Sequence, residues 1–186
     1  MTYELISSKM IYSGRVFDIR SDLVQLPGGR THLFDIVDHR PAVTMIPMDE
    51  DRRICFIRQY RLAAGKELIE LPAGVLEVGE EPMAGAQREI REEVGMSANN
   101  LKLIGEFFLA PGYSTERMYV YLADRLTPDP LPKDEDEFIS LERISITEAY
   151  RMVRLHQIED AKSISALLLA LPYFIESEGI TLSTLG

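Results

Sequence analysis

The chain has 186 residues, of which 46% are apolar and 27% are charged, a composition typical of a soluble globular protein with a substantial core. Thirty acidic against twenty basic residues give a formal charge of −10, which argues against unassisted binding to nucleic acid or to an anionic membrane. The lone Cys55 excludes an internal disulfide, and no apolar run is long enough to span a bilayer, so we expect a cytoplasmic protein.

The first forty residues contain short segments rich in β-branched and aromatic residues, as strands do. They are residues 10–19, 22–26 and 31–38. Gly28 and Gly29 tolerate positive φ and therefore predict a hairpin between the last two segments. We expect a small antiparallel β domain over residues 1–40 and a second domain over residues 41–186, with Pro41 at the boundary.

The second part of the chain mixes strand and helix patterns. The pattern is strand-like over residues 42–48, 53–60, 67–74, 101–110, 118–126 and 138–145. From Pro82 the apolar period becomes helical, recurring at Met83, Ala86, Ile90 and Val94, with Gly95 just past the helix end. Two further helices are expected at about 146–156 and 159–174. This order of elements favours an α+β or α/β sandwich.

The middle helix carries three carboxylates, Glu89, Glu92 and Glu93, at spacings that bring them to one face. Like charges so placed cost about 0.2–0.5 kcal/mol per pair, and the C-terminal end of a helix also disfavours anions. One explanation is a solvated face neutralised by Arg88 and Arg91. The other is a divalent-cation site, because carboxylate oxygens are the ligands that Mg²⁺ and Mn²⁺ prefer.

The residues upstream favour the cation site. Gly74 is followed after five residues by Glu80, and seven residues later by Arg88-Glu89-Ile90-Arg91-Glu92-Glu93-Val94-Gly95-Met96. This spacing matches every defined position of the Nudix box, so the chain resembles the Nudix hydrolases, which use Mg²⁺ or Mn²⁺ to cleave nucleoside diphosphates linked to another moiety. The resemblance implies the Nudix fold, an α/β/α sandwich, for the second domain.

The same resemblance implies residue roles. Glu89 and Glu93 would be the principal metal ligands, Glu92 a further ligand, and the Ala73 carbonyl would complete the coordination shell. Arg88 would hold the glutamates through a salt bridge. The catalytic set implied is Arg88, Glu92, Glu93 and Glu137, of which Glu137, or else Glu135, would be the general base.

Outside the box, the chain resembles the ADP-ribose pyrophosphatase subgroup. Pro111 lies sixteen residues after Gly95 and is followed by Gly112 and Glu116. This resemblance implies a substrate-binding loop, although an ordinary turn would also explain Pro111 and Gly112. In "FIRQYR", Arg61 or else Arg58 is implied as the ligand of the diphosphate, the alternative being a surface arginine paired with an acid.

The subgroup also implies a homodimer in which the N-terminal domains are exchanged and contribute substrate contacts. The first choice of reaction is the hydrolysis of ADP-ribose to AMP and ribose 5-phosphate, with ADP-glucose or GDP-mannose as alternative substrates. A Nudix-fold sensor that binds such a ligand without cleaving it is the competing hypothesis. The complete set of glutamates favours the enzyme.

Overall fold

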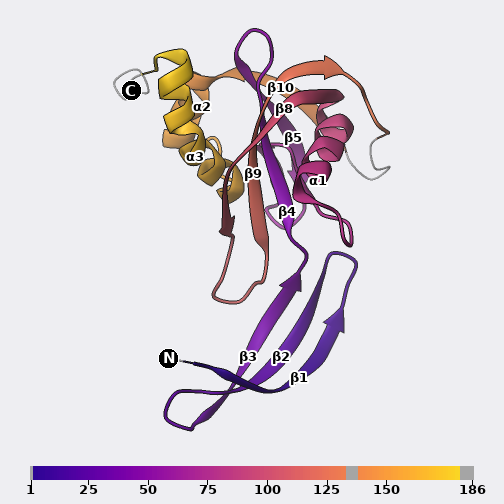
Figure 1. Ribbon diagram of the computed structural model, residues 1–186, viewed down its shortest axis with the longest axis vertical. Coiled ribbons are helices and arrows are strands. Elements are labelled where there is room, and N and C mark those ends of the chain that lie inside the picture. Colours follow the sequence, from indigo (N-terminus) through magenta and orange to yellow (C-terminus); the bar gives the residue numbers. More distant parts are fainter. Residues whose placement is uncertain (1, 133–137, 181–186) are drawn as a thin grey trace. The chain divides into compact units, whose positions relative to one another are not determined.

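The computed structural model describes residues 2–132 and 138–180, and these form two compact units (Figure 1). The first unit comprises the residues up to Pro41 together with Phe107–Met118, and the second comprises Ala42–Glu106 and the residues from Tyr119 onward. Within the described ranges, no helix combines the length and apolar character needed to cross a membrane.

The first unit is built on a three-stranded antiparallel sheet in the order β1-β2-β3. Its strands are β1 (Glu4–Ser13), β2 (Phe17–Gln25) and β3 (Thr31–His39). The predicted β2–β3 hairpin is present, with Gly28 and Gly29 at φ of +97° and +86°. The expected strand over residues 10–19 is instead divided by a turn at Gly14, where a Cβ would lie 2.8 Å from the Phe17 carbonyl oxygen.

The second unit contains two sheets, ordered β10-β5-β6 and β7-β4-β9-β8. Their strands are β4 (Ala42–Pro47), β5 (Arg53–Arg61), β6 (Lys66–Glu70), β7 (Ala73–Val75), β8 (Met96–Phe108), β9 (Arg117–Pro128) and β10 (Ile139–Ser145). Every residue of β4 is buried, as expected of a strand covered on both faces. The predicted strand over residues 67–74 is divided between β6 and β7, because Pro72 interrupts it and has no N–H to donate.

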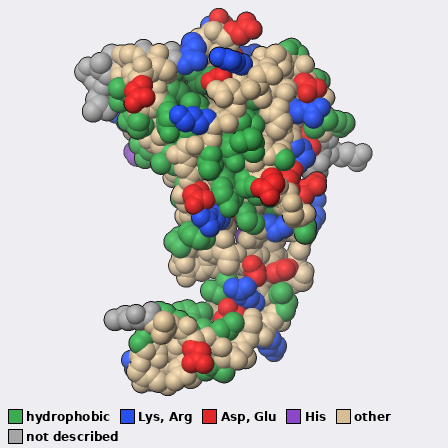
Figure 2. Space-filling model, viewed as in Figure 1, with side chains coloured by type: hydrophobic (Ala, Val, Ile, Leu, Met, Phe, Trp, Pro, Cys, Tyr) green, Lys and Arg blue, Asp and Glu red, His purple; other side chains and the backbone are tan. Residues whose placement is uncertain are grey.

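Helices cover both sides of these sheets (Figure 1). Helix α1 (Pro82–Glu89) packs on β4 and β7, whereas α2 (Ile146–Arg154) packs on β5 and β10, and α3 (Ala161–Glu178) packs on β4. Figure 2 shows hydrophobic side chains gathered over the strands between α3 and α1, with charged side chains mainly around them. The arrangement is the predicted sandwich of helices and sheets, joined to a separate antiparallel β sheet.

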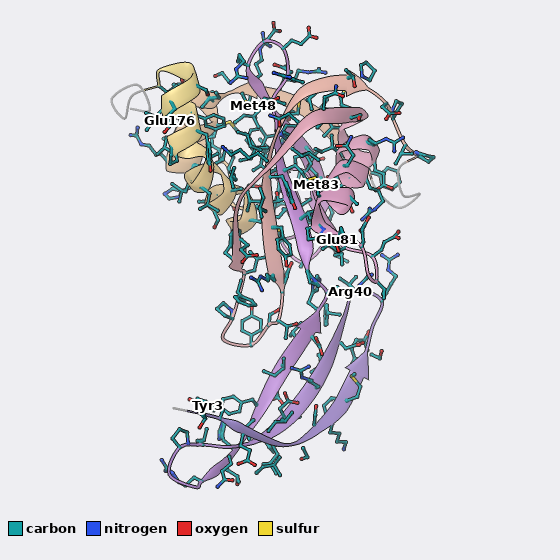
Figure 3. All side chains as sticks on the ribbon, in the orientation of Figure 1. Tyr3, Arg40, Met48, Glu81, Met83 and Glu176 are labelled. Atoms are coloured by element: carbon teal, nitrogen blue, oxygen red, sulfur yellow. The ribbon has the colours of Figure 1, made fainter. Side chains whose placement is uncertain are left out.

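The central helix differs in detail from its prediction. After α1, residues Ile90–Val94 form a single π-helical turn, η1, which ends at Gly95 with φ of +75°. A π-turn uses the same residues as an α-helix, so apolar periodicity does not distinguish them, and such turns are often found at functional sites. Glu81 and Met83 lie where the loop joins α1 (Figure 3), and Met83 is 54% exposed, so it does not continue the buried face of Ile90 and Val94.

Candidate active site

The loop before α1 is held against the carboxylates of the helix. Strand β7 pairs with β4, and this pairing fixes the backbone of Ala73 and Gly74. A Cβ on Gly74 would lie 1.9 Å from Oε1 of Glu89, so only glycine permits this approach. The Gly74 of the motif therefore makes room for a buried carboxylate.

Arg88 is the centre of the charge arrangement. Its Nε and Nη2 donate to the two oxygens of Glu80 at 3.0 and 2.9 Å, and its Nη1 donates to Glu89 at 2.6 Å and to Glu92 at 2.9 Å. A further hydrogen bond from Nη2 reaches the Val75 carbonyl. The hydrogen bond from Arg88, more than any other contact, lowers the pKa of Glu80. One guanidinium thus joins three carboxylates and the loop.

The side chain of Glu93 is oriented by the backbone of β7. The Ala73 N–H donates to Oε2 of Glu93 at 2.9 Å, and the Glu93 residue is only 4% exposed. Glu89 is also buried. The expected metal ligands Ala73, Glu89, Glu92 and Glu93 are therefore brought to one region by β7, α1 and η1.

The chemistry of this donor set fits a hard divalent cation. Glu80, Glu89 and Glu92 share the single positive charge of Arg88, which leaves a net negative charge. Oxygen donors are the ligands that hard divalent cations take. In the described part of the chain, no three His, Cys, Asp or Glu side chains are grouped as closely as a formed metal centre requires.

A second charged cluster lies beside the first. The Nε and Nη2 groups of Arg61 donate to the two oxygens of Glu70, both at 2.7 Å, and Lys162 donates to the same carboxylate. Glu70 is almost fully buried. Burial alone would raise the Glu70 pKa, but the hydrogen bonds and charges of Arg61 and Lys162 outweigh it and lower that pKa. The motif did not predict Glu70 or Lys162, since they lie 92 residues apart and share no local pattern.

Arg58, the second candidate ligand of the diphosphate, has a different partner from Arg61. Arg58 donates to Glu142 on the neighbouring strand β10 at 2.6 Å, the surface pairing that was the alternative to substrate binding. Glu137 and Glu135 lie outside the described residues, so the identity of the base stays a prediction.

The proposed substrate loop belongs to the first unit. Residues 111–116, which include Pro111, Gly112 and Glu116, connect β8 to β9, and the backbone here pairs with β3 through Val37. The Val37 N–H donates to the Tyr113 carbonyl at 2.8 Å, and the Thr115 N–H donates to the Val37 carbonyl at 3.0 Å. The loop is therefore fastened to the N-terminal sheet, and its contact with substrate stays a prediction.

Comparison with known proteins identifies the family. The model of the NUDIX domain matches residues 38–167. The chain belongs to the Nudix family. One Nudix relative is the ADP-ribose pyrophosphatase of Bacillus subtilis, which is 34% identical over 87% of this chain and 89% of that protein. Another is the ADP-ribose pyrophosphatase of Mycobacterium tuberculosis, which is 37% identical over 89% of this chain and 82% of that protein. The methanol dehydrogenase activator of Bacillus methanolicus is 35% identical over 87% and 89% of the two chains.

The Nudix fold is also found by structural comparison. A crystal structure of an ADP compounds hydrolase superposes with a TM-score of 0.85, covering 96% of this chain and 97% of that one at 24% identity. The predicted family, the α+β fold class with its N-terminal antiparallel sheet, and the assignment as a Nudix hydrolase are confirmed. The roles of individual residues stay predictions.

Proposed function

We propose that the chain hydrolyses the pyrophosphate bond of ADP-ribose in a Mg²⁺-dependent reaction, with Mn²⁺ as the alternative ion, giving AMP and ribose 5-phosphate. The observation that carries this proposal is the complete carboxylate set beside the Ala73–Gly74 backbone, in which Glu89 and Glu92 accept from Arg88 and Glu93 accepts from the Ala73 N–H. The ADP-ribose pyrophosphatases among the relatives support the choice of substrate.

The residues that would hold the cation are Glu89, Glu92, Glu93 and the Ala73 carbonyl. A bound divalent ion supplies charge neutralisation for the diphosphate and a lowered pKa for water. In our proposal Arg61 binds the diphosphate, and Glu137, or else Glu135, accepts a proton from the attacking water. The water oxygen bonds to one phosphorus in line, and the bridging oxygen leaves with the other phosphoryl group.

The test is a substrate panel of ADP-ribose, ADP-glucose, GDP-mannose, dinucleoside polyphosphates and NADH, each with Mg²⁺ and with EDTA. We expect ADP-ribose to give the highest kcat/KM and EDTA to abolish turnover. A higher kcat/KM for ADP-glucose or GDP-mannose would replace the substrate but keep the reaction class. Absence of turnover with every member would contradict the proposed activity.

The competing sensor hypothesis predicts binding without cleavage. Glu93→Gln keeps the size of the side chain but removes its charge, so we expect turnover to fall by about 10²–10⁴-fold, the range for one catalytic group. Calorimetry should still detect ADP-ribose binding to this variant. Glu81→Gln is the matched control, since Glu81 is exposed at the start of the same helix. Equal turnover in both variants would refute the role of Glu93.

We further propose that residues 1–40 form a domain that is exchanged in a cytoplasmic homodimer. Every residue of β1 is exposed in the single chain, including several large apolar side chains, which is uncommon on a stable monomer surface. They are Leu5, Ile6, Met10, Ile11 and Tyr12. Analytical ultracentrifugation should give a dimer for the wild type and a monomer for Leu5→Glu/Ile11→Glu, and a monomeric wild type would contradict the proposal.

A further inference from the structure

The charged cluster around Glu70 joins strand β6 to the first turn of α3. Lys162 donates to Glu70 and, at 2.8 Å, to Asp160, the N-cap residue of α3. The same turn is fixed to the chain just after β6 by the hydroxyl of Ser163, which accepts the Leu71 N–H at 2.7 Å. Two anions and two cations, Arg61 included, thus meet at this junction.

The cluster is buried at one end and open at the other. The side chains of Glu70 and Lys162 are 2% and 11% exposed, whereas that of Arg61 is 41% exposed. Two N–H groups of Arg61 are used by Glu70, and a guanidinium has five. Arg61 is therefore held by a buried carboxylate while its own side chain stays partly exposed, with three N–H groups that Glu70 does not use.

The open end lies within electrostatic reach of the carboxylate site. Glu70 is three residues before Ala73, whose N–H orients Glu93. The hydrogen bonding of Arg61 to the Glu70 carboxylate, which accepts from it, is the main cause that raises the pKa of Arg61, and the negative charge of Glu93 adds to it. Strand β5, which ends at Arg61, also packs on η1, which carries Glu92 and Glu93. Arg61 is thus placed near the residues that would hold the cation.

Buried charges are an expensive way to join a strand to a helix, because apolar residues of similar size do this at least as well. The charges have a further effect on Arg61. The formal charges of Arg61, Lys162, Glu70 and Asp160 sum to zero. Without Lys162, the formal charges of the other three sum to −1. A cluster that contains Arg61 but has a net negative charge would repel the diphosphate that Arg61 is proposed to bind.

We propose that Glu70 and Lys162 are positioning residues, which fix the Arg61 guanidinium and cancel the surrounding negative charge so that Arg61 can bind the diphosphate of the substrate. This inference rests on the proposed pyrophosphatase function. Neither residue contacts the reacting atoms. Lys162 acts on the substrate only through Glu70 and Arg61.

Steady-state kinetics of two single variants and their double variant test this dependence. Arg61→Met should raise KM about 10–100-fold, the range for losing a hydrogen bond to a charged group. Lys162→Met should raise KM about 3–10-fold and leave kcat within about twofold, as expected for a coupling between neighbours. The double variant should match Arg61→Met. An unchanged KM in Lys162→Met, or additive effects in the double variant, would overturn the proposal.

The matched control is Lys102→Met. Lys102 lies over the ring of Tyr173 on α3, 4.4 Å from its centroid, so the same substitution removes a cation that contacts the same helix without touching the cluster. We expect wild-type KM and kcat. Where the Lys162→Met protein is insoluble, Lys162→Gln serves instead, because it also removes the charge but retains a donor for Glu70.

A measurement without substrate separates this inference from the proposed function. The ¹⁵N–¹H NMR signal of Arg61 Nε is identified by its loss in Arg61→Met. We expect this signal to shift in Lys162→Met and to stay unchanged in Lys102→Met. If no member of the substrate panel is turned over, the pyrophosphatase proposal is refuted, and with it the diphosphate role of Arg61. If the Arg61 Nε signal does not shift in Lys162→Met, the positioning of Arg61 by Lys162 is refuted, whatever the activity.

Discussion

Gly74 and Glu89 approach so closely that a Cβ on residue 74 would lie 1.9 Å from Oε1 of the carboxylate. Gly74→Ala must therefore displace Glu89 or the β7 backbone. We expect kcat/KM to fall about 10–100-fold, the usual cost of disturbing the support of a metal site. The half-saturating Mg²⁺ concentration should rise with it, and both are measured by Mg²⁺ titration of the initial rate.

The control for Gly74 lies in the loop between β7 and α1. Gly79 has φ of +78°, but a Cβ added there would meet nothing within 4 Å, so Gly79→Ala introduces backbone strain without displacing a carboxylate. It should lower the Tm, since the left-handed region costs about 1–2 kcal/mol for a residue with a side chain, and it should leave the Mg²⁺ dependence unchanged. A similar Mg²⁺ response in both variants would show that Gly74 matters only for stability.

Arg88 gives a prediction about stability and cation binding together. Arg88→Met leaves Glu80, Glu89 and Glu92 without their shared guanidinium, so we expect the free energy of unfolding to fall by about 3–5 kcal/mol in EDTA. Because the remaining carboxylates repel one another, Mg²⁺ should restore more stability to this variant than it adds to the wild type. Urea titrations with EDTA and with Mg²⁺ measure both quantities, and an equal gain in the two proteins would contradict a shared cation site.

Glu70 should make stability depend on pH. Its pKa in the folded state is lowered from 4.5, so its contribution is complete above pH 4.5 and is lost as the pH falls through the lower folded value. Glu70→Gln should therefore be much less stable than the wild type at pH 7, and the difference should shrink on acidification below pH 4.5. Urea unfolding of both proteins across this range measures the difference, and a constant gap would contradict the assignment.

Cys55 should be unreactive in the folded protein. Burial, as the main cause, raises the pKa of its thiol to about 11, and the residue is 1% exposed. Since the thiolate is the reactive form, Ellman's reagent at pH 8 should modify Cys55 far more slowly in buffer than in urea. Equal rates under the two conditions would place the thiol at the surface.

The sequence predicted those parts of the structure that depend on short, spaced patterns. The hairpin at Gly28 and Gly29 follows from the freedom of glycine at positive φ. The resemblance to the Nudix family implied that Ala73, Glu89 and Glu93 lie together, although it did not predict the hydrogen bond from the Ala73 N–H to Glu93.

Other features depend on contacts that no local pattern records. The π-turn has the same apolar spacing as a continued α-helix. The pairing of Val37 with the loop at residues 111–116, and that of Glu70 with Lys162, join residues far apart in the chain. A lysine in an apolar helix was therefore indistinguishable in the sequence from an ordinary polar residue.

The contact between β6 and the first turn of α3 also bears on the order in which the protein is made. During synthesis the ribosome releases Glu70, Gly74 and Glu93 well before Lys162. A nascent chain can therefore form β7 and α1 while Glu70 still lacks its second cation. Arg61 reaches its final electrostatic setting only when α3 has formed, so translation of residues 160–163 completes the charged cluster well after the residues of the Nudix box have been made.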